Sequence, residues 1–272
     1  MFHSRVRCAI LIVKVSRMST RPFFLLTGDD SVRAEGIILV KRLVQDWADF
    51  QIVATREQMS GAGSKATFPG GSYGTEYVDG HEAIWVSGTP ADAVYFASQY
   101  LERPINMVIS GMNLGQNVTN EMHRSGTVGA ALTAAQCRGL KAIAVSIMVS
   151  EEKFFMQHTG SFDEKLLEYP GKKLLQLIQQ ALKTDFPPQS FWNINFPAHP
   201  SDVVKVVPAS NSQYWVNDLT IKEGVYSYRD TLGDQLKPGE DIAELLAGAI
   251  TVTPCKVEYT DAQQLGKLQE MI

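Results

Sequence analysis

Short apolar runs alternate with longer amphipathic segments through the first 150 residues of the chain. Residues 23–27 are apolar and stop at Gly28-Asp29-Asp30, and residues 32–47 then carry apolar side chains at helical spacing. Apolar runs of about four to eight residues are typical of buried strands, and spacings of three or four are typical of helices. The same pattern predicts strands at 49–55, 106–110 and 142–147 and helices at 91–101 and 126–137.

This alternation favours right-handed βαβ units, so we predict a doubly wound, Rossmann-like α/β fold with a mostly parallel sheet. Two strand-like stretches within residues 76–88 flank Asp79-Gly80, which predicts a hairpin. Beyond Val149 the pattern changes, and we predict a long amphipathic helix at 166–182, a strand at 192–196 and short β stretches at 205–228. A helix at 241–246 and a strand at 250–253 follow, and we expect this strand to return to the core.

The chain of 272 residues is long enough for one large α/β domain. We expect that domain to cover residues 21–254, with a small β-rich appendage at about 205–240 and a C-terminal tail at 255–272. Residues 1–20 contain a short apolar run broken by Lys14 and Arg17, followed by Met18. We interpret them as an extension before a true start at Met18, and the alternatives are a genuine extra segment or a targeting peptide.

Charge and cysteine content narrow the class of protein. The formal net charge of -4 argues against a surface for long nucleic acids or anionic membranes. No apolar run approaches the about 18 residues that span a bilayer. Three widely spaced cysteines suggest neither a disulfide framework nor a Cys-x-x-Cys site. We therefore expect a cytoplasmic protein with a small ligand and no nucleic-acid or membrane partner.

Candidate metal ligands follow successive predicted strands. Asp29 and Asp30 follow the first strand, Ser60 lies in the loop after the second, and Asn113 follows the strand that ends at Ser110. Ligands of parallel sheets bind outside the carboxyl ends of the strands. Adjacent carboxylates repel each other unless a cation or proton offsets them, and oxygen ligands favour Mg²⁺ or Mn²⁺ over Zn²⁺. Each residue alone has a plainer explanation as a helix cap, loop residue or turn former, so the prediction of one divalent cation rests on their joint placement.

A phosphate site is predicted at Ser125-Gly126-Thr127, which opens the helix at 126–137. Free N–H groups and the helix dipole favour anions at such a terminus, and the two hydroxyls are further donors. The alternative is that Ser125 only caps the helix.

Seven motifs, taken in order, resemble the SurE family of survival-protein nucleotidases. They are residues 25–31 (LLTGDDS), 52–63 (IVATREQMSGAG), 88–92 (GTPAD), 108–117 (VISGMNLGQN), 125–128 (SGTV), 193–197 (NINFP) and 250–254 (ITVTP). The resemblance covers about residues 21–254. It implies a SurE-like fold and a 5'-nucleotidase, a phosphatase that hydrolyses nucleoside 5'- and 3'-monophosphates.

The resemblance also implies roles for single residues. The metal ligands of the family, for Mg²⁺ or Mn²⁺, fall on Asp29, Asp30, Ser60 and Asn113, and of these Asp29 and Asp30 are the expected catalytic residues. Its phosphate-side positions fall on Asn117, Ser125, Gly126 and Thr127. It further implies a homodimer or homotetramer that forms through an exchanged C-terminal segment. The alternative is a non-catalytic or weakly active nucleotide- or phosphate-binding protein on the same fold.

The chain departs from the family pattern at four places, and the changes at Gly28, Ser31 and Arg56 favour that alternative. Gly28 replaces the usual Asn, Ser31 the usual Gly, Glu35 the usual Pro, and Thr55-Arg56-Glu57 the usual Pro-Asp-Arg. Loss of the Asn removes a side chain that could brace the carboxylates. We therefore expect weak metal binding.

Overall fold

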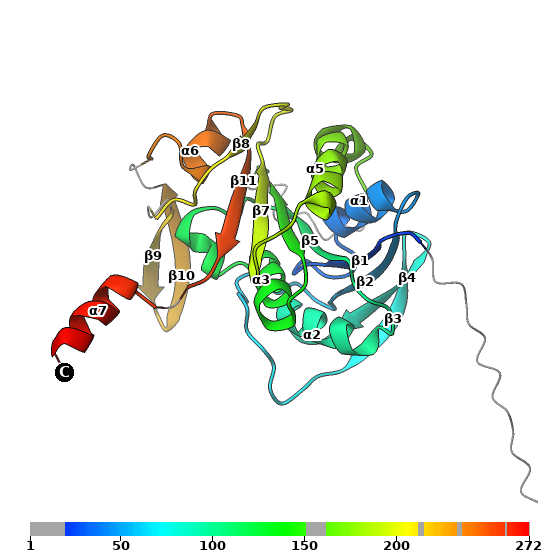
Figure 1. The fold of residues 1–272 in the computed structure, drawn as a ribbon, viewed down its shortest axis with the longest axis horizontal. Coiled ribbons are helices and arrows are strands. Elements are labelled where there is room, and N and C mark those ends of the chain that lie inside the picture. Colours follow the sequence, from blue (N-terminus) through cyan, green and yellow to red (C-terminus); the bar gives the residue numbers. More distant parts are fainter. Residues whose placement is uncertain (1–19, 151–161, 212–214, 233–235, 259, 272) are drawn as a thin grey trace, which may run out of the picture.

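The computed structural model describes residues 20–150, 162–211, 215–232, 236–258 and 260–271. The predicted extension at residues 1–20 lies outside the described residues except for Thr20. A nine-stranded, mostly parallel sheet with helices on both faces forms the body of the protein (Figure 1). This arrangement confirms the predicted doubly wound α/β fold.

The strand order is β3-β4-β2-β1-β5-β6-β7-β11-β8, and only the β3·β4 and β7·β11 pairs are antiparallel. The strands are β1 (Phe23–Thr27), β2 (Asp49–Thr55), β3 (Tyr73–Val78), β4 (His81–Val86), β5 (Met107–Leu114), β6 (Ala142–Ile147), β7 (Ser190–Phe196), β8 (Val204–Val206) and β11 (Ile250–Lys256). The chain adds β2 on one side of β1 and β5 on the other. Such a reversal opens a crevice at the carboxyl end of β1, where ligands of these folds bind.

Two helices cover each face of the sheet. α1 (Glu35–Val44) and α5 (Lys172–Lys183) pack on one face, and α2 (Pro90–Tyr100) and α3 (Gly126–Arg138) pack on the other. In β1 the side chains of Phe24 and Leu26 join the first core and Leu25 joins the second. Successive strand side chains point to opposite faces, so both layers are fixed to the strand that precedes Asp29.

Helix starts follow the sequence signals. Thr89 caps α2 and forms a capping box with Asp92, with Pro90 at the first helical position. Ser125 caps α3, and Gly139, with φ of 63°, ends it. Serine and threonine caps satisfy N–H groups that have no partner inside the helix, and a left-handed glycine ends a helix without a Cβ clash.

Several predicted elements had the wrong extent. α1 is shorter than residues 32–47. β5 continues to Leu114 instead of ending at Ser110, with a register break between Ser110 and Asn113 where Gly111 has φ of 108°. The predicted helix at 166–182 is interrupted by a π-helical segment, η2 (Leu167–Gly171), in which Tyr169 is not helical. A residue before proline is disfavoured in the α conformation, which explains the break before Pro170.

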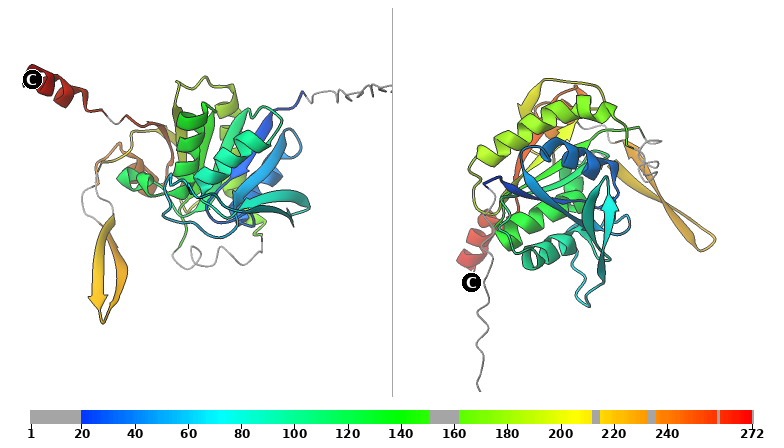
Figure 2. Two further views of the ribbon diagram at one scale, coloured as in Figure 1. Left: turned by 90° about the horizontal axis from the view of Figure 1, so that it is seen from below. Right: turned by 90° about the vertical axis from the view of Figure 1, so that its right-hand side faces the viewer.

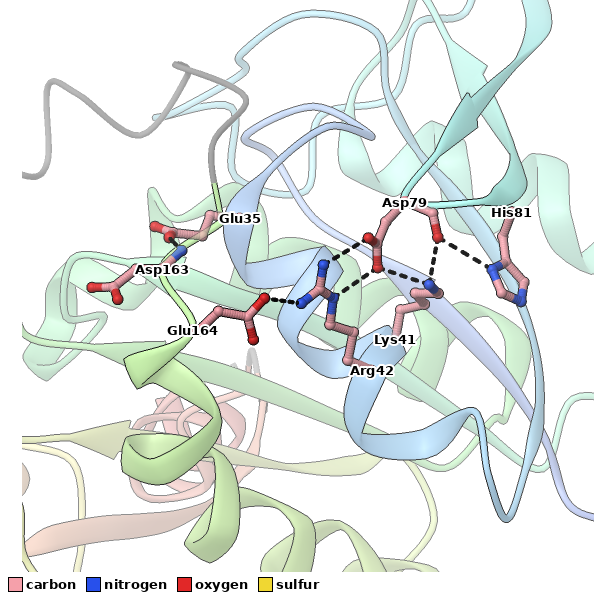
Figure 3. Close-up of polar contacts among 7 residues, drawn as sticks. All are labelled: Glu35, Lys41, Arg42, Asp79, His81, Asp163 and Glu164. Atoms are coloured by element: carbon pink, nitrogen blue, oxygen red, sulfur yellow. Dashed lines mark hydrogen bonds and ion pairs between the residues drawn. The ribbon is translucent and has the colours of Figure 1, made fainter.

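A partly buried ion-pair cluster connects α1 to the hairpin of β3 and β4 (Figure 3). Lys41 Nζ lies 2.7 Å from Asp79 Oδ2, and Arg42 Nη2 lies 2.8 Å from Asp79 Oδ1. Hydrogen bonds from Arg42, and then from Lys41, hold the pKa of Asp79 well below its usual value. Asp79 and Gly80 have φ of 46° and 78°, as the predicted two-residue turn requires. Arg42 also donates to the exposed Glu164, which links the cluster to the segment that leads into α5.

The appendage begins after β8. β9 (Trp215–Lys222) and β10 (Val225–Leu232) form a separate antiparallel hairpin that projects from the body, as Figure 2 shows. α6 (Asp241–Leu246) follows, and β11 returns to the sheet beside β7, as predicted. α7 (Ala262–Met271) extends away from the body (Figure 1). None of the helices within the described ranges is long and apolar enough to cross a membrane.

Candidate active site

Asp29 lies in the loop at the carboxyl end of β1, and the first turn of α3 faces it. Only 5% of Asp29 is exposed, and the Thr127 hydroxyl donates a hydrogen bond to Asp29 Oδ1. A Cβ atom added to Gly126 would lie 2.7 Å from Asp29 Oδ2, so glycine permits this close approach. Burial raises the pKa of Asp29, and hydrogen bonds from Thr127 and the backbone of Gly126 oppose that rise. The first turn of α3 therefore packs directly against the Asp29 carboxylate.

Asp30 is buried beside Asp29 with one oxygen unsatisfied. Its Oδ1 has no hydrogen-bond partner among the residues that the structure describes. Burial, followed by the charge of Asp29, raises the pKa of Asp30 to about 8, and a hydrogen bond from Gln58 opposes the shift. A buried carboxylate without a partner costs several kcal/mol unless a proton or cation compensates it. The pair is thus suited to a divalent cation.

The loop after β2 contacts both the loop after β1 and the residues just before α3. Met59 N donates to Asp29 O at 2.7 Å, and Gly63 N donates to Arg124 O at 2.9 Å, just before α3. Ser60 lies between these two anchors, and its side chain is exposed. The structure therefore brings the loop of Ser60 to the carboxylates and leaves the Ser60 side chain facing solvent.

Asn113 lies near the end of β5 and is 8% exposed. It was predicted to follow the strand, but it lies within β5, beyond the register break at Gly111. Asn113 Nδ2 donates to Gly115 O at 2.7 Å, which leaves its Oδ1 for another ligand. On the neighbouring strands, Thr27 pairs with Ser110, and both hydroxyls are buried without a partner in the described part of the chain.

The phosphate-side residues have different surroundings. Ser125 Oγ accepts a hydrogen bond from Val128 N at 3.1 Å, so its hydroxyl hydrogen is available to an external acceptor. The hydroxyl hydrogen of Thr127 is already donated to Asp29. Asn117 Nδ2 donates to Ser146 Oγ at 2.8 Å, and Asn117 N donates to Asn195 Oδ1 at 2.8 Å. Direct phosphate contacts by Asn117, Gly126 and Thr127 stay predictions, and the structure gives Asn117 and Thr127 a role in holding the site.

Sequence reasoning missed two groups that shape the site. Gln58 contacts Asp30, and nothing in the loop composition indicated it. Asn193 and Asn195 both donate to Asn117 O, at 2.7 and 2.9 Å. Their alternate positions in the predicted strand at 192–196 would place them on one face, which was the available signal.

The donor set favours a hard cation. In the described ranges, three or more His, Cys, Asp or Glu side chains nowhere gather into a group that could hold a metal ion. A cation at Asp29 and Asp30 would therefore need neutral oxygen ligands, and Asn113 Oδ1 and Ser60 Oγ are of that type. Carboxylate, carbonyl and hydroxyl oxygens suit Mg²⁺ or Mn²⁺.

Comparison with known proteins assigns the family. Residues 24–216 match the family model described as survival protein SurE. The chain is 30% identical over 250 residues to the 5'-nucleotidase SurE of Wolbachia pipientis subsp. Culex pipiens, an alignment that covers 90% of this chain and 92% of that protein. The chain belongs to the SurE family.

Further SurE proteins agree with this assignment. The 5'-nucleotidase SurE of Methanothermobacter thermautotrophicus is 34% identical over 200 residues, which cover 71% of this chain and 75% of that protein. The crystal structure of the SurE protein from Aquifex aeolicus has the same fold, with a TM-score of 0.74 and 23% identity over 92% of this chain and 99% of that one. All predicted site residues lie within the part that matches the SurE family model.

Proposed function

We propose that this SurE chain is a phosphatase that hydrolyses nucleoside 5'-monophosphates, and 3'-monophosphates, with one Mg²⁺ or Mn²⁺ ion. The observation that carries the proposal is the pair of buried carboxylates, Asp29 and Asp30, with Asp30 Oδ1 unpartnered among the described residues. The names of the relatives, 5'-nucleotidase SurE, support the same activity.

Asp29 and Asp30 would hold the cation, and Ser60 and Asn113 would complete its ligands. A divalent cation at such a site polarises a phosphoryl oxygen and offsets the developing negative charge. Thr127 keeps Asp29 oriented through its hydroxyl. The Ser125 hydroxyl donates to a phosphate oxygen beside the start of α3, where the helix dipole favours an anion by about 0.3–1 kcal/mol.

The decisive assay measures release of inorganic phosphate from AMP and GMP with Mn²⁺, with and without a chelator. We expect activity that the chelator abolishes and that Asp30→Asn lowers by on the order of 100-fold, because a charged ligand becomes neutral. Asp46→Asn is the matched control, since Asp46 is exposed and away from the site. Binding of AMP without phosphate release would contradict the proposal and favour a non-catalytic nucleotide-binding protein.

We also propose that the chain works as a homodimer or homotetramer. The hairpin exposes apolar side chains at Leu219, Ile221 and Val225, and α7 exposes Leu265 and Leu268. An isolated two-stranded hairpin is marginally stable in water. We therefore expect a second copy of the chain to pack against these exposed apolar side chains. Light scattering should give a mass of two or four chains, and deletion of residues 260–272 should lower it. A monomeric parent chain would contradict this proposal.

A further inference from the structure

A buried carboxylate at the base of the appendage joins three segments of the chain. Asp241, at the start of α6, is 0% exposed. Its Oδ1 accepts from Ser210 N at 2.9 Å and from Ile242 N at 2.8 Å, and its Oδ2 accepts from Thr119 N at 2.8 Å. Ser210 and Asp241 lie before and after the segment that contains the hairpin of β9 and β10. Thr119 belongs to the loop between β5 and α3. One side chain thus connects the appendage to a loop of the site.

Thr119 has a left-handed backbone conformation, which is unfavourable for its β-branched side chain. Its φ is 61°, and the residue is fully buried. The left-handed conformation is unfavourable for residues other than glycine, and β-branched residues rarely adopt it. Such a conformation persists only where the surroundings hold it. The hydrogen bond from Thr119 N to Asp241 is a contact from outside the turn that can do so, and within the turn Thr119 Oγ1 accepts from Glu121 N at 3.3 Å.

The conformation of Thr119 sets the direction of the chain as it enters α3. Thr119 begins the 3-10 helix η1 (Thr119–His123), which leads to the cap residue Ser125 and then to Thr127, the partner of Asp29. On the other side of Thr119, Val118 packs against Ile242 and Leu245 of α6. α6 therefore supplies both a polar and an apolar contact to this turn.

We propose that Asp241 is a positioning residue for the active site, an inference that rests on the proposed phosphatase function. It holds Thr119 in the left-handed conformation and so fixes the loop between Asn113 and Ser125. Asp241 touches neither the carboxylate pair nor the start of α3. Turnover then depends on how the base of the appendage is attached to the body.

An aspartate suits this place because three backbone N–H groups point at two oxygens. The amide of an asparagine has one accepting oxygen and an NH₂ group, which opposes any N–H donor that faces it. Asp241→Asn therefore keeps the shape and loses either the loop or the appendage contact.

The test compares Asp241→Asn with Glu240→Gln, the same chemical change one residue away. Glu240 accepts from the Ser210 hydroxyl and does not contact the Thr119 loop. We expect Asp241→Asn to lower kcat for AMP by about tenfold or more, in line with the loss of a charged hydrogen bond. Glu240→Gln should stay within about twofold of the parent, because the half-buried contact of Glu240 with Ser210 does not reach the Thr119 loop.

Rescue distinguishes positioning from a general loss of stability. Glycine adopts φ near 61° without a Cβ penalty, so Thr119→Gly added to Asp241→Asn should recover part of the lost kcat. A purely stabilising role of Asp241 would lower the melting temperature and leave the kcat of the folded enzyme unchanged. Parent-like kcat in Asp241→Asn, or a loss that Thr119→Gly does not reduce, would overturn the proposal.

Two further measurements keep the test decisive. If Asp241→Asn is insoluble, Asp241→Glu keeps the charge but displaces the carboxylate, and the same loss and rescue are expected. Hydrogen exchange of the peptide over residues 115–125 reports on the loop without any turnover, and it should be faster in Asp241→Asn than in Glu240→Gln. A parent chain without phosphatase activity would refute the proposed function, whereas unchanged exchange in this peptide would refute the role of Asp241.

Discussion

The Thr127 hydroxyl donates its hydrogen to Oδ1 of Asp29, across 98 positions of the sequence. The bond connects the first turn of α3 to the loop after β1 and thus joins two of the βαβ units. Because the hydroxyl is fully buried, its orientation is fixed by this one acceptor. Groups that orient a ligand in this way control the affinity of a metal site as well as its geometry.

Thr127→Val should weaken metal binding while the protein remains folded. The change keeps the shape and removes the donor, so the Mn²⁺ concentration for half-maximal activity should rise by about tenfold. Thr133→Val is the matched control, because Thr133 is buried in the same helix and donates to Gly129 O at 2.7 Å, away from the carboxylates. Equal metal dependence in the two variants would show that Thr127 does not orient Asp29.

Gly28→Asn should tighten metal binding. A Cβ atom at Gly28 would meet only ordinary contacts, with Ile37 Cδ1 at 3.6 Å and Gly111 N at 3.7 Å. An amide there can brace the neighbouring carboxylates, and such outer contacts typically change affinity by about 10–100-fold. A titration with Mn²⁺ compares it with Gly28→Ala, which adds the Cβ without the amide. If asparagine binds no tighter than alanine, another group already braces the site.

Ser31→Gly should stabilise the fold. Ser31 has φ of 80°, a conformation that costs a residue with a Cβ roughly 1–2 kcal/mol. Glycine removes that cost and loses about 0.5–1 kcal/mol through its freer unfolded chain, so a net gain of up to about 1.5 kcal/mol is expected. Thermal unfolding of Ser31→Ala, which keeps the strained backbone, should show no gain. A lower melting temperature for Ser31→Gly than for Ser31→Ala would contradict this account.

Asp79→Asn should destabilise the protein at neutral pH and much less in acid. Arg42 and Lys41 hold the pKa of Asp79 below its unfolded value of about 3.9. A carboxylate with a lowered pKa contributes its full stability above the unfolded pKa and loses it as the pH falls below that value. We expect a cost of about 1–3 kcal/mol at pH 7, measured by urea unfolding, and a smaller difference near pH 3.

The control for this pH dependence is Glu164→Gln, which removes the exposed partner of Arg42. Exposed ion pairs contribute about 0–1 kcal/mol, so this variant should be nearly neutral at both pH values. A cost of Asp79→Asn that does not change with pH would mean that packing, not charge, holds the hairpin turn to α1.

The fold was largely predictable because its strands carry local signals. β1, β2 and β6 coincide with the predicted runs, since each is a buried apolar segment with polar residues at its end. The extension of β5 was not predictable, because Gly111 permits an irregular pair that continues the strand past a polar residue. The proline itself signalled the break at Pro170, but the amphipathic pattern around it favoured the prediction of an uninterrupted helix.

The site was only partly predictable for a different reason. A sequence shows which donors and acceptors are present, but not which of them bond to each other. The Thr127 hydroxyl was predicted to face a phosphate, but in the structure it donates a hydrogen bond to Asp29. Asp241 lies 122 positions from Thr119, so no local pattern could relate them. Hydrogen bonds between residues far apart in the sequence are determined by tertiary packing and not by composition.

The place of β11 in the sheet has a consequence for a chain that is still being synthesised. β11 is the last strand of the described chain, yet it lies between β7 and β8, and residues 197–249 separate it from β7. Until it leaves the ribosome, the edge of β7 is open to unwanted pairing, and β8 has no neighbour. The nascent chain therefore carries both carboxylates of the site, which follow β1, long before β11 can complete the sheet beyond β7.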